Sequence, residues 1–203
     1  MKIVVKIGGA ALDNSELLPK CARAVADLAR DGHQVAVVHG GGAALTRTLA
    51  QVGKKSEFLH GLRVTDPETR DYAVMVLAGQ INKLLVAAMS RVGQPAIGLC
   101  GGDGMTFRAR KKKMNGYDLG YVGEIVSVDP RWLEAIWAHG AVPVISSIAI
   151  GPEGFTVRDP CFTVDNTAWW PKAWATFIPK PWPRFRASHP TCEIARPRSK
   201  GSP

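Results

Sequence analysis

Short, continuous runs of apolar residues recur along the first 150 residues of the chain, and segments with helical spacing lie between them. The runs predict buried strands over 2–7, 34–38, 96–99 and 142–145. Apolar positions three and four residues apart predict helices over 16–31 and 42–52, and a longer one that ends at Gly93. Strands that alternate with helices predict an α/β fold with a mainly parallel sheet and helices on both faces.

Two Asp-Pro pairs mark helix starts, because an acidic N-cap followed by proline suits the first turn of a helix. Asp66-Pro67 begins the long helix, and Asp129-Pro130 begins another. Residues 107–113 and 120–128 predict a β-hairpin around Asn115-Gly116.

The composition of the chain changes after Gly154. Residues 155–203 hold 8 of the 14 prolines, 4 of the 6 tryptophans and a single glycine, Gly201. Prolines at that density interrupt both helices and strand ladders. We therefore expect a folded unit over 1–154 and an aberrant, poorly ordered tail rich in Pro, Trp and Arg over 155–203.

The net charge of +9 is concentrated in this tail. Residues 155–203 hold 8 of the 26 Lys and Arg residues but only 3 of the 17 acidic ones, so they contribute +5. A positive charge of this size is typical of proteins that bind nucleic acid, but no known nucleic-acid-binding fold accompanies it here. A binder of nucleic acid through the tail is therefore the weakest interpretation, and failure to retain DNA at any salt concentration would remove it.

Cysteine and histidine usage indicates a cytoplasmic protein with no metal site of its own. The four cysteines lie far apart without a C-x-x-C pair, and the five histidines have no metal-ligand spacing. No uninterrupted apolar run approaches the roughly 20 residues of a membrane span, so we expect no membrane partner.

Two glycine turns, each directly after an apolar strand, carry the candidate chemistry. Gly8-Gly9 follows residues 2–7, and Gly40-Gly41-Gly42 follows His39. Anions bind at the carboxyl ends of parallel strands, where backbone N–H groups and a helix N-terminus are exposed. Two such turns, together with Lys6 at the end of its strand, indicate a site that binds a phosphate at one turn and a carboxylate at the other.

Several motifs occur together in an order that resembles the amino acid kinase family, and within it the N-acetylglutamate kinases of arginine biosynthesis. They are Lys6-Ile7-Gly8-Gly9, His39 to Gly42, Gly61 to Asp66, Asn82-Lys83, Gly98-Leu99 with Gly102 to Gly104, Asp118 to Glu124, and Val142 to Ile148. The resemblance covers residues 1 to about 154. It implies the N-terminal half of a three-layer αβα sandwich, and phosphoryl transfer from ATP with Mg²⁺ to the side-chain carboxylate of N-acetyl-L-glutamate.

The resemblance also implies roles for particular residues. Lys6 would be the catalytic residue that neutralises the transferring phosphoryl group, with Gly8 and Gly9 on the nucleotide side. Gly41 and Gly42 would hold the substrate, and Arg63 would take its α-carboxylate as a bidentate fork. The hairpin over 107–128 would lie over the substrate as a lid. Family members pair through the helix that corresponds to residues 67–89, which implies a homodimer.

The chain departs from the family pattern after residue 154. Family members are longer and carry an Asn-x-Asn-Ala-Asp motif, whereas this chain reads Phe155 to Asn166 without it. No later segment resembles the nucleotide-binding half. We interpret the tail as translation in a shifted reading frame, against the alternative of a genuine but diverged extension. Catalysis by this chain alone is not expected, because binding without the phosphoryl donor site supplies no chemistry.

Two further alternatives remain open. A kinase for N-acetylaminoadipate or a related acidic amino acid differs by one methylene, which changes affinity by only about 1–3 kcal/mol. A non-catalytic binding remnant would retain the acidic amino-acid site and bind its ligand without turnover.

Overall fold

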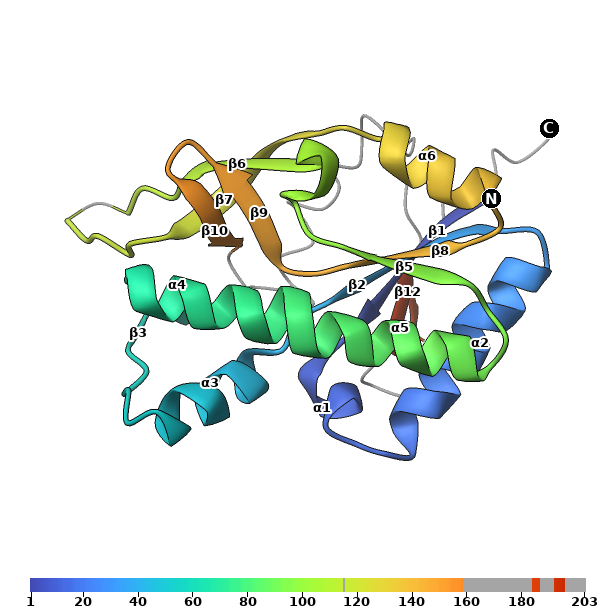
Figure 1. The fold of residues 1–203 in the computed structure, drawn as a ribbon, viewed down its shortest axis with the longest axis horizontal. Coiled ribbons are helices and arrows are strands. Elements are labelled where there is room, and N and C mark those ends of the chain that lie inside the picture. Colours follow the sequence, from blue (N-terminus) through green and yellow to red (C-terminus); the bar gives the residue numbers. More distant parts are fainter. Residues whose placement is uncertain (115, 159–183, 187–191, 196–203) are drawn as a thin grey trace.

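A six-stranded sheet forms the centre of the computed structural model, which describes residues 1–114, 116–158, 184–186 and 192–195. Its strand order is β11-β12-β1-β2-β8-β5 (Figure 1). The parallel strands are β1 (Lys2–Ile7), β2 (Gln34–His39), β8 (Val142–Ile145) and β5 (Ala96–Leu99). Each was predicted from its continuous apolar run, which is typical of strands in a parallel sheet that is covered by helices.

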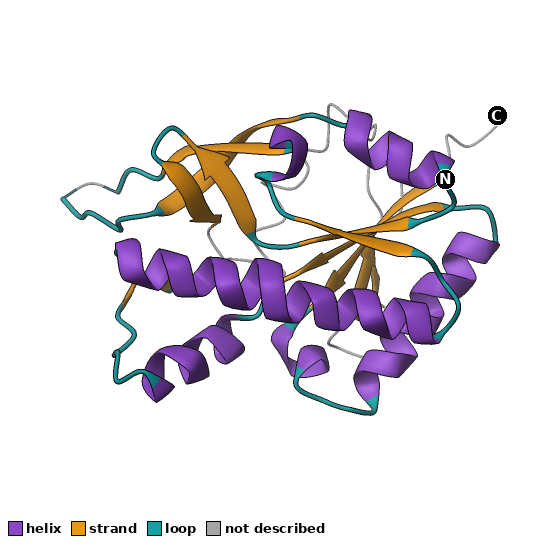
Figure 2. Cartoon of the chain, in the orientation of Figure 1, coloured by secondary structure: helices purple, strands orange, loops and turns teal. Residues whose placement is uncertain are grey.

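Helices cover both faces of this sheet (Figure 2). One face packs Ile3, Val5 and Ile7 of β1 against α2 (Leu17–Arg30) and the long helix. The other face packs Ala36 and Val38 of β2 against α6 (Arg131–Ala138). Successive side chains of β1 and β2 point to opposite faces of the sheet and pack into two separate cores. The predicted αβα arrangement with a mainly parallel sheet is confirmed.

The long helix runs without a break through α4 (Pro67–Ala73), a π-helical stretch η1 (Val74–Ile81) and α5 (Asn82–Arg91). It begins as predicted, since the Asp66 carboxylate accepts from the Thr69 amide at 2.7 Å. By length and composition the segment Pro67–Arg91 could cross a membrane, which the search for uninterrupted apolar runs missed. Within its most apolar window, 44% of the residues are buried inside the protein.

A four-stranded barrel lies beside the sheet, in the upper left of Figure 1. Its strands are β6 (Phe107–Lys111), β7 (Val122–Val128), β9 (Ile148–Gly151) and β10 (Gly154–Arg158). β6 and β7 pair antiparallel, so the predicted hairpin is confirmed. The strands β9 and β10 were not predicted, because neither carries a long apolar run.

Two short strands fall inside the segment that was expected to be poorly ordered. β12 (Cys192–Ala195) pairs antiparallel with β1, and β11 (Arg184–Arg186) pairs with β12. Segments this short fit between the prolines at 183, 190 and 197, and the poor order expected of the tail as a whole stays a prediction. β10 also crosses the boundary proposed at residue 154. The other tail residues lie outside the described ranges, so the division at 154 stays a prediction.

Candidate functional site

Both glycine turns lie at the carboxyl edge of the sheet, on neighbouring strands. Ile7 of β1 is in register with His39 of β2, so both strands reach their turns at the same level. Gly8 is the N-cap of α1 (Gly9–Leu12), and Gly41 is the N-cap of α3 (Gly42–Gln51). The two loops are therefore neighbours, as the sequence led us to expect.

Gly41 is required by its surroundings. Its φ of +149° is one that side chains rarely adopt, and a Cβ added there would lie 2.7 Å from Leu77 Cδ2. The turn thus rests directly on the long helix. An added Cβ at Gly9 or Gly42 would meet nothing within 4 Å, so both positions border open space.

Arg63 lies beside this turn, with its side chain buried. Its Nη2 donates to the carbonyl of Gly42 at 3.2 Å and to Thr46 Oγ1 at 2.8 Å, and its Nη1 donates to Ser56 Oγ. The guanidinium also stacks 4.6 Å from the ring centroid of Phe58. The structure therefore brings together two of the predicted site residues, Gly42 and Arg63.

The electrostatics of Arg63 are unusual for a buried cation. Within the part of the chain that the structure describes, no acidic side chain forms an ion pair with it, and its hydrogen-bond acceptors are neutral oxygens. Burial lowers the pKa of the Arg63 guanidinium from its ordinary value. A buried charge is costly unless it is paired. This arrangement therefore favours an anion at the open side of the Gly42 turn.

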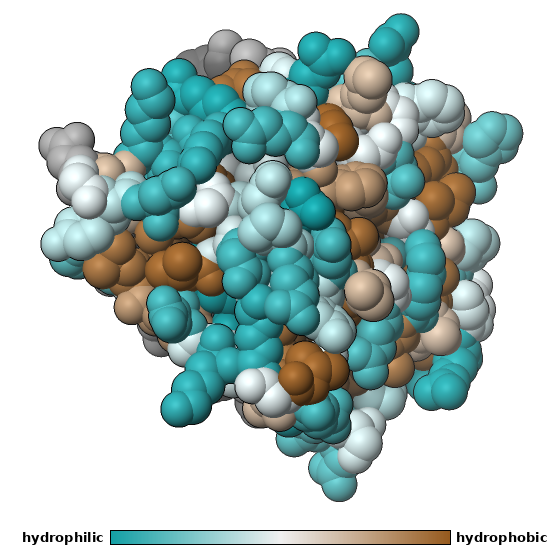
Figure 3. Space-filling model, turned by 60° about the vertical axis from the view of Figure 1, so that its left-hand side comes forward, coloured by the Kyte–Doolittle hydropathy of each residue, from teal (hydrophilic) through white to brown (hydrophobic). Residues whose placement is uncertain are grey.

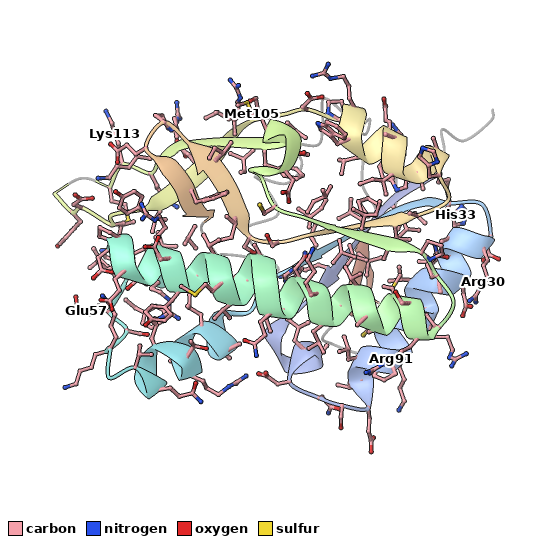
Figure 4. All side chains as sticks on the ribbon, in the orientation of Figure 1. Arg30, His33, Glu57, Arg91, Met105 and Lys113 are labelled. Atoms are coloured by element: carbon pink, nitrogen blue, oxygen red, sulfur yellow. The ribbon has the colours of Figure 1, made fainter. Side chains whose placement is uncertain are left out.

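A small hairpin carries Arg63 to this position. It consists of β3 (Phe58–Leu59) and β4 (Leu62–Arg63), and both turn residues have positive φ, at 49° for His60 and 81° for Gly61. Two-residue turns of this kind match the twist of paired strands. Glu57, next to this hairpin, lies at the same end of the molecule as Lys113, opposite Arg30, His33 and Arg91 (Figure 4).

The segment after Arg63 is held from two sides. Lys54 Nζ lies 2.7 Å from Asp66 Oδ2 and 2.6 Å from Glu68 Oε2, which closes the loop that contains Arg63. The Thr65 amide donates to the Leu119 carbonyl at 2.9 Å, and the Tyr121 amide donates to the Thr65 carbonyl at 2.7 Å. Both of these bonds join the hairpin over 107–128 to the Arg63 segment. Figure 3 turns this end forward and shows mainly hydrophilic side chains with hydrophobic groups among them.

Lys6 is the penultimate residue of β1 and pairs in register with Val38. It shares its face of the strand with Val4, which packs against the core on the α6 side. Its side chain is partly buried. The structure places Lys6 and the Gly8-Gly9 turn at one strand end, while the roles implied for them remain predictions.

A buried hydrogen-bond network under the second turn was not predicted. His39 Nδ1 lies 2.8 Å from the Gly40 carbonyl, and His39 Nε2 lies 3.1 Å from Asn82 Nδ2. Asn82 Nδ2 also donates to the Val144 carbonyl at 2.9 Å, and Ser147 Oγ donates to the His39 carbonyl at 2.7 Å. His39 is thus a packed histidine that stabilises the loop, and the network joins β2, α5 and β8.

Sequence reasoning also missed the polar partners of Arg63. Thr46 lies one helical turn after Gly42, a spacing that could have placed it on the same face of α3. Ser56 and Phe58 carry no such signal, because only the turn at His60-Gly61 folds them back onto Arg63.

Comparison with known proteins gives a consistent set of relatives. The model of the amino acid kinase family matches residues 1–168. A protein from Acidobacterium capsulatum named acetylglutamate kinase is 69% identical over 154 residues, and one of the same name from Koribacter versatilis is 58% identical. Each alignment covers 76% of this chain and 59% of the relative. The chain therefore spans about three fifths of the length of these relatives.

Solved structures share the fold. The N-acetylglutamate synthase from Neisseria gonorrhoeae, complexed with coenzyme A and N-acetyl-glutamate, aligns with a TM-score of 0.65 and 25% identity over 77% of this chain and 36% of its own. The smu.665 protein from Streptococcus mutans aligns with a TM-score of 0.70 and 23% identity over 85% of this chain and 66% of its own, a likeness of fold alone.

Proposed function

The chain belongs to the amino acid kinase family, and on that premise we propose that it is the amino-acid-substrate half of an N-acetylglutamate kinase. The reaction is transfer of the γ-phosphoryl group of ATP to the side-chain carboxylate of N-acetyl-L-glutamate, which yields an acyl phosphate. Identities of 69% and 58% over 154 residues to relatives named acetylglutamate kinase support this proposal.

The observation that carries the proposal is the buried guanidinium of Arg63 beside the first turn of α3. It is bonded only to neutral oxygens among the described residues, and it borders the open position at Gly42. A planar guanidinium pairs with a carboxylate through two parallel hydrogen bonds. The first N–H groups of a helix have no partner within the helix and favour negative charge. Arg63, Gly41 and Gly42 would together hold the α-carboxylate end of the substrate.

The nucleotide side of the site would lie at the end of β1. Lys6 would neutralise the transferring phosphoryl oxygens, and the Gly8-Gly9 turn would offer backbone N–H groups to the phosphates. No three His, Cys, Asp or Glu side chains in the described part of the chain lie close enough to hold a metal ion. The Mg²⁺ would enter bound to the phosphates of ATP.

We further propose a cytoplasmic homodimer that does not act on membranes or nucleic acids. The long helix leaves the Met75 and Leu84 side chains 59% and 39% exposed, which gives a second copy an apolar surface to pack on. The hairpin that Thr65 anchors would cover the bound substrate.

Turnover by this chain alone is not proposed. The residues after Arg158 lack the Asn-x-Asn-Ala-Asp motif and any segment like the nucleotide half. The chain would therefore bind N-acetylglutamate without forming the acyl phosphate.

Two assays on the full chain test these statements. Calorimetric titration should show saturable binding of N-acetyl-L-glutamate, tighter than that of N-acetyl-L-2-aminoadipate by about 10- to 200-fold, the usual effect of one methylene. Tighter binding of the longer ligand would favour the aminoadipate kinase instead. A coupled assay with Mg-ATP should detect no substrate-dependent ADP, and ADP release would show that the chain is a complete enzyme.

A further inference from the structure

Thr46 joins the two elements that the proposed function assigns to the substrate. Its hydroxyl donates to the Gly42 carbonyl at 2.9 Å, one turn earlier in α3, and accepts from Arg63 Nη2 at 2.8 Å. One hydroxyl supplies one donor and two acceptor lone pairs, so both bonds are compatible. Thr46 thus fixes one arm of the guanidinium relative to the first turn of the helix.

The other contacts of Arg63 hold it less specifically. Its direct bond to the Gly42 carbonyl is longer, at 3.2 Å, and the Phe58 ring fixes only the plane of the guanidinium. Ser56 holds the opposite arm from a loop. Among these partners, Thr46 is the side chain that lies on the same helix as the glycine turn.

We infer that Thr46 is a positioning residue for carboxylate binding, which sets the rotation of the Arg63 guanidinium that the α-carboxylate meets. The inference rests on the proposed function and adds a determinant of affinity to it. Thr46 itself need not touch the ligand. Without its hydroxyl the guanidinium keeps its charge but loses one of the three hydrogen bonds that orient it, and its hydrogen bonds to the carboxylate weaken.

The same helix offers a matched control. Thr48 Oγ1 donates to the Ala44 carbonyl at 3.1 Å, which is the bond that Thr46 makes to Gly42, but the bonds found for Thr48 do not include Arg63. Thr46→Val and Thr48→Val therefore remove the same kind of helix bond, and both keep a β-branched side chain at the substituted position. Only Thr46→Val also removes a partner of Arg63. Thr46→Ser keeps the hydroxyl and should therefore retain the affinity of the wild type.

The experiment combines ligand affinity with a direct view of the guanidinium. Calorimetric titration with N-acetyl-L-glutamate should show affinity reduced about tenfold in Thr46→Val, and changed less than twofold in Thr48→Val and Thr46→Ser, as expected for one lost bond to a charged group. NMR of the Arg63 side-chain nitrogens in the ligand-free chain should show fast rotation about Nε–Cζ in Thr46→Val alone. Melting temperatures of the two valine variants should agree, which separates positioning from stability.

The outcomes separate the inference from the proposed function. If the wild type does not bind N-acetyl-L-glutamate, both are refuted. If it binds, and Thr46→Val is no weaker than Thr48→Val or leaves guanidinium rotation unchanged, the inference alone is overturned.

Discussion

Acidification should destabilise this protein through one buried side chain, His39. The ring is 1% exposed and faces the Gly40 carbonyl at Nδ1 and the Asn82 amide at Nε2. Asn82 Nδ2 also donates to the Val144 carbonyl, so the amide orientation is set and Nε2 must accept. The histidine is therefore held neutral, with its proton on Nδ1. Burial lowers its pKa from 6.5 to about 4, although the bond to Gly40 opposes this in part.

The sign and size of the effect follow from proton linkage. Between pH 6.5 and 4 the unfolded state binds a proton at this site and the folded state does not, so the free energy of unfolding falls as the pH falls. The contribution is fully present above pH 6.5 and is lost progressively down to about pH 4. From pH 7 to pH 5 the loss is about 2 kcal/mol, and the complete loss is roughly 3 kcal/mol.

Urea unfolding at pH 7 and pH 5 measures this loss, with His39→Asn as the control. Asparagine does not titrate, and its amide nitrogen can replace the Nδ1 donor to Gly40. The variant should start less stable, because Asn82 loses one acceptor, yet it should lose about 2 kcal/mol less than the wild type between the two pH values. Parallel losses in the two proteins would refute the assignment of a neutral, buried His39.

Three further predictions concern the turn, the loop and the tail. Gly41→Ala should lower the free energy of unfolding, measured in urea, by about 1–3 kcal/mol, because its Cβ would strain the backbone and meet Leu77. Gly42→Ala should have no such effect, and equal effects of the two substitutions would contradict the packing at Gly41. Lys54→Met should raise the pKa of the Asp66 carboxyl from about 2 toward 3.8, because the hydrogen bond from Lys54 is the largest cause of the lowered pKa. An NMR titration that shows an unchanged pKa would assign the shift to the Thr69 contacts. Translation of codons 150–160 in all three frames should restore an Asn-x-Asn-Ala-Asp motif in another frame, and the absence of one would establish the tail as genuine.

Much of the sheet could be predicted because its parallel strands consist of continuous apolar runs. Residues 2–7 form a strand with the predicted bounds, and Asp66 caps the long helix as expected. β9 and β10 could not be found in this way, since each is short and their pairing depends on the two-residue turn between Gly151 and Gly154 rather than on a long apolar run. The π-helical stretch within the long helix likewise has no signature in the apolar spacing.

The site was predictable in its parts but not in its connections. Arg63 and the glycine turns stood out from their motifs, and the structure places Arg63 in contact with Gly42. The residues that orient Arg63 could not be read in advance, because Ser56 meets it only through the small hairpin. The Asn82 contact with His39 likewise depends on how the long helix crosses the sheet.

The role of Arg63 in substrate binding is tested most directly by the affinity of the chain for N-acetyl-L-glutamate, measured by calorimetry for the wild type, Arg63→Gln and Arg63→Lys. We expect saturable binding to the wild type, weakened at least tenfold, or about 1.4 kcal/mol, in Arg63→Gln and less in Arg63→Lys, with circular dichroism confirming that all three are folded. No binding to the wild type, or equal binding to all three, would contradict it.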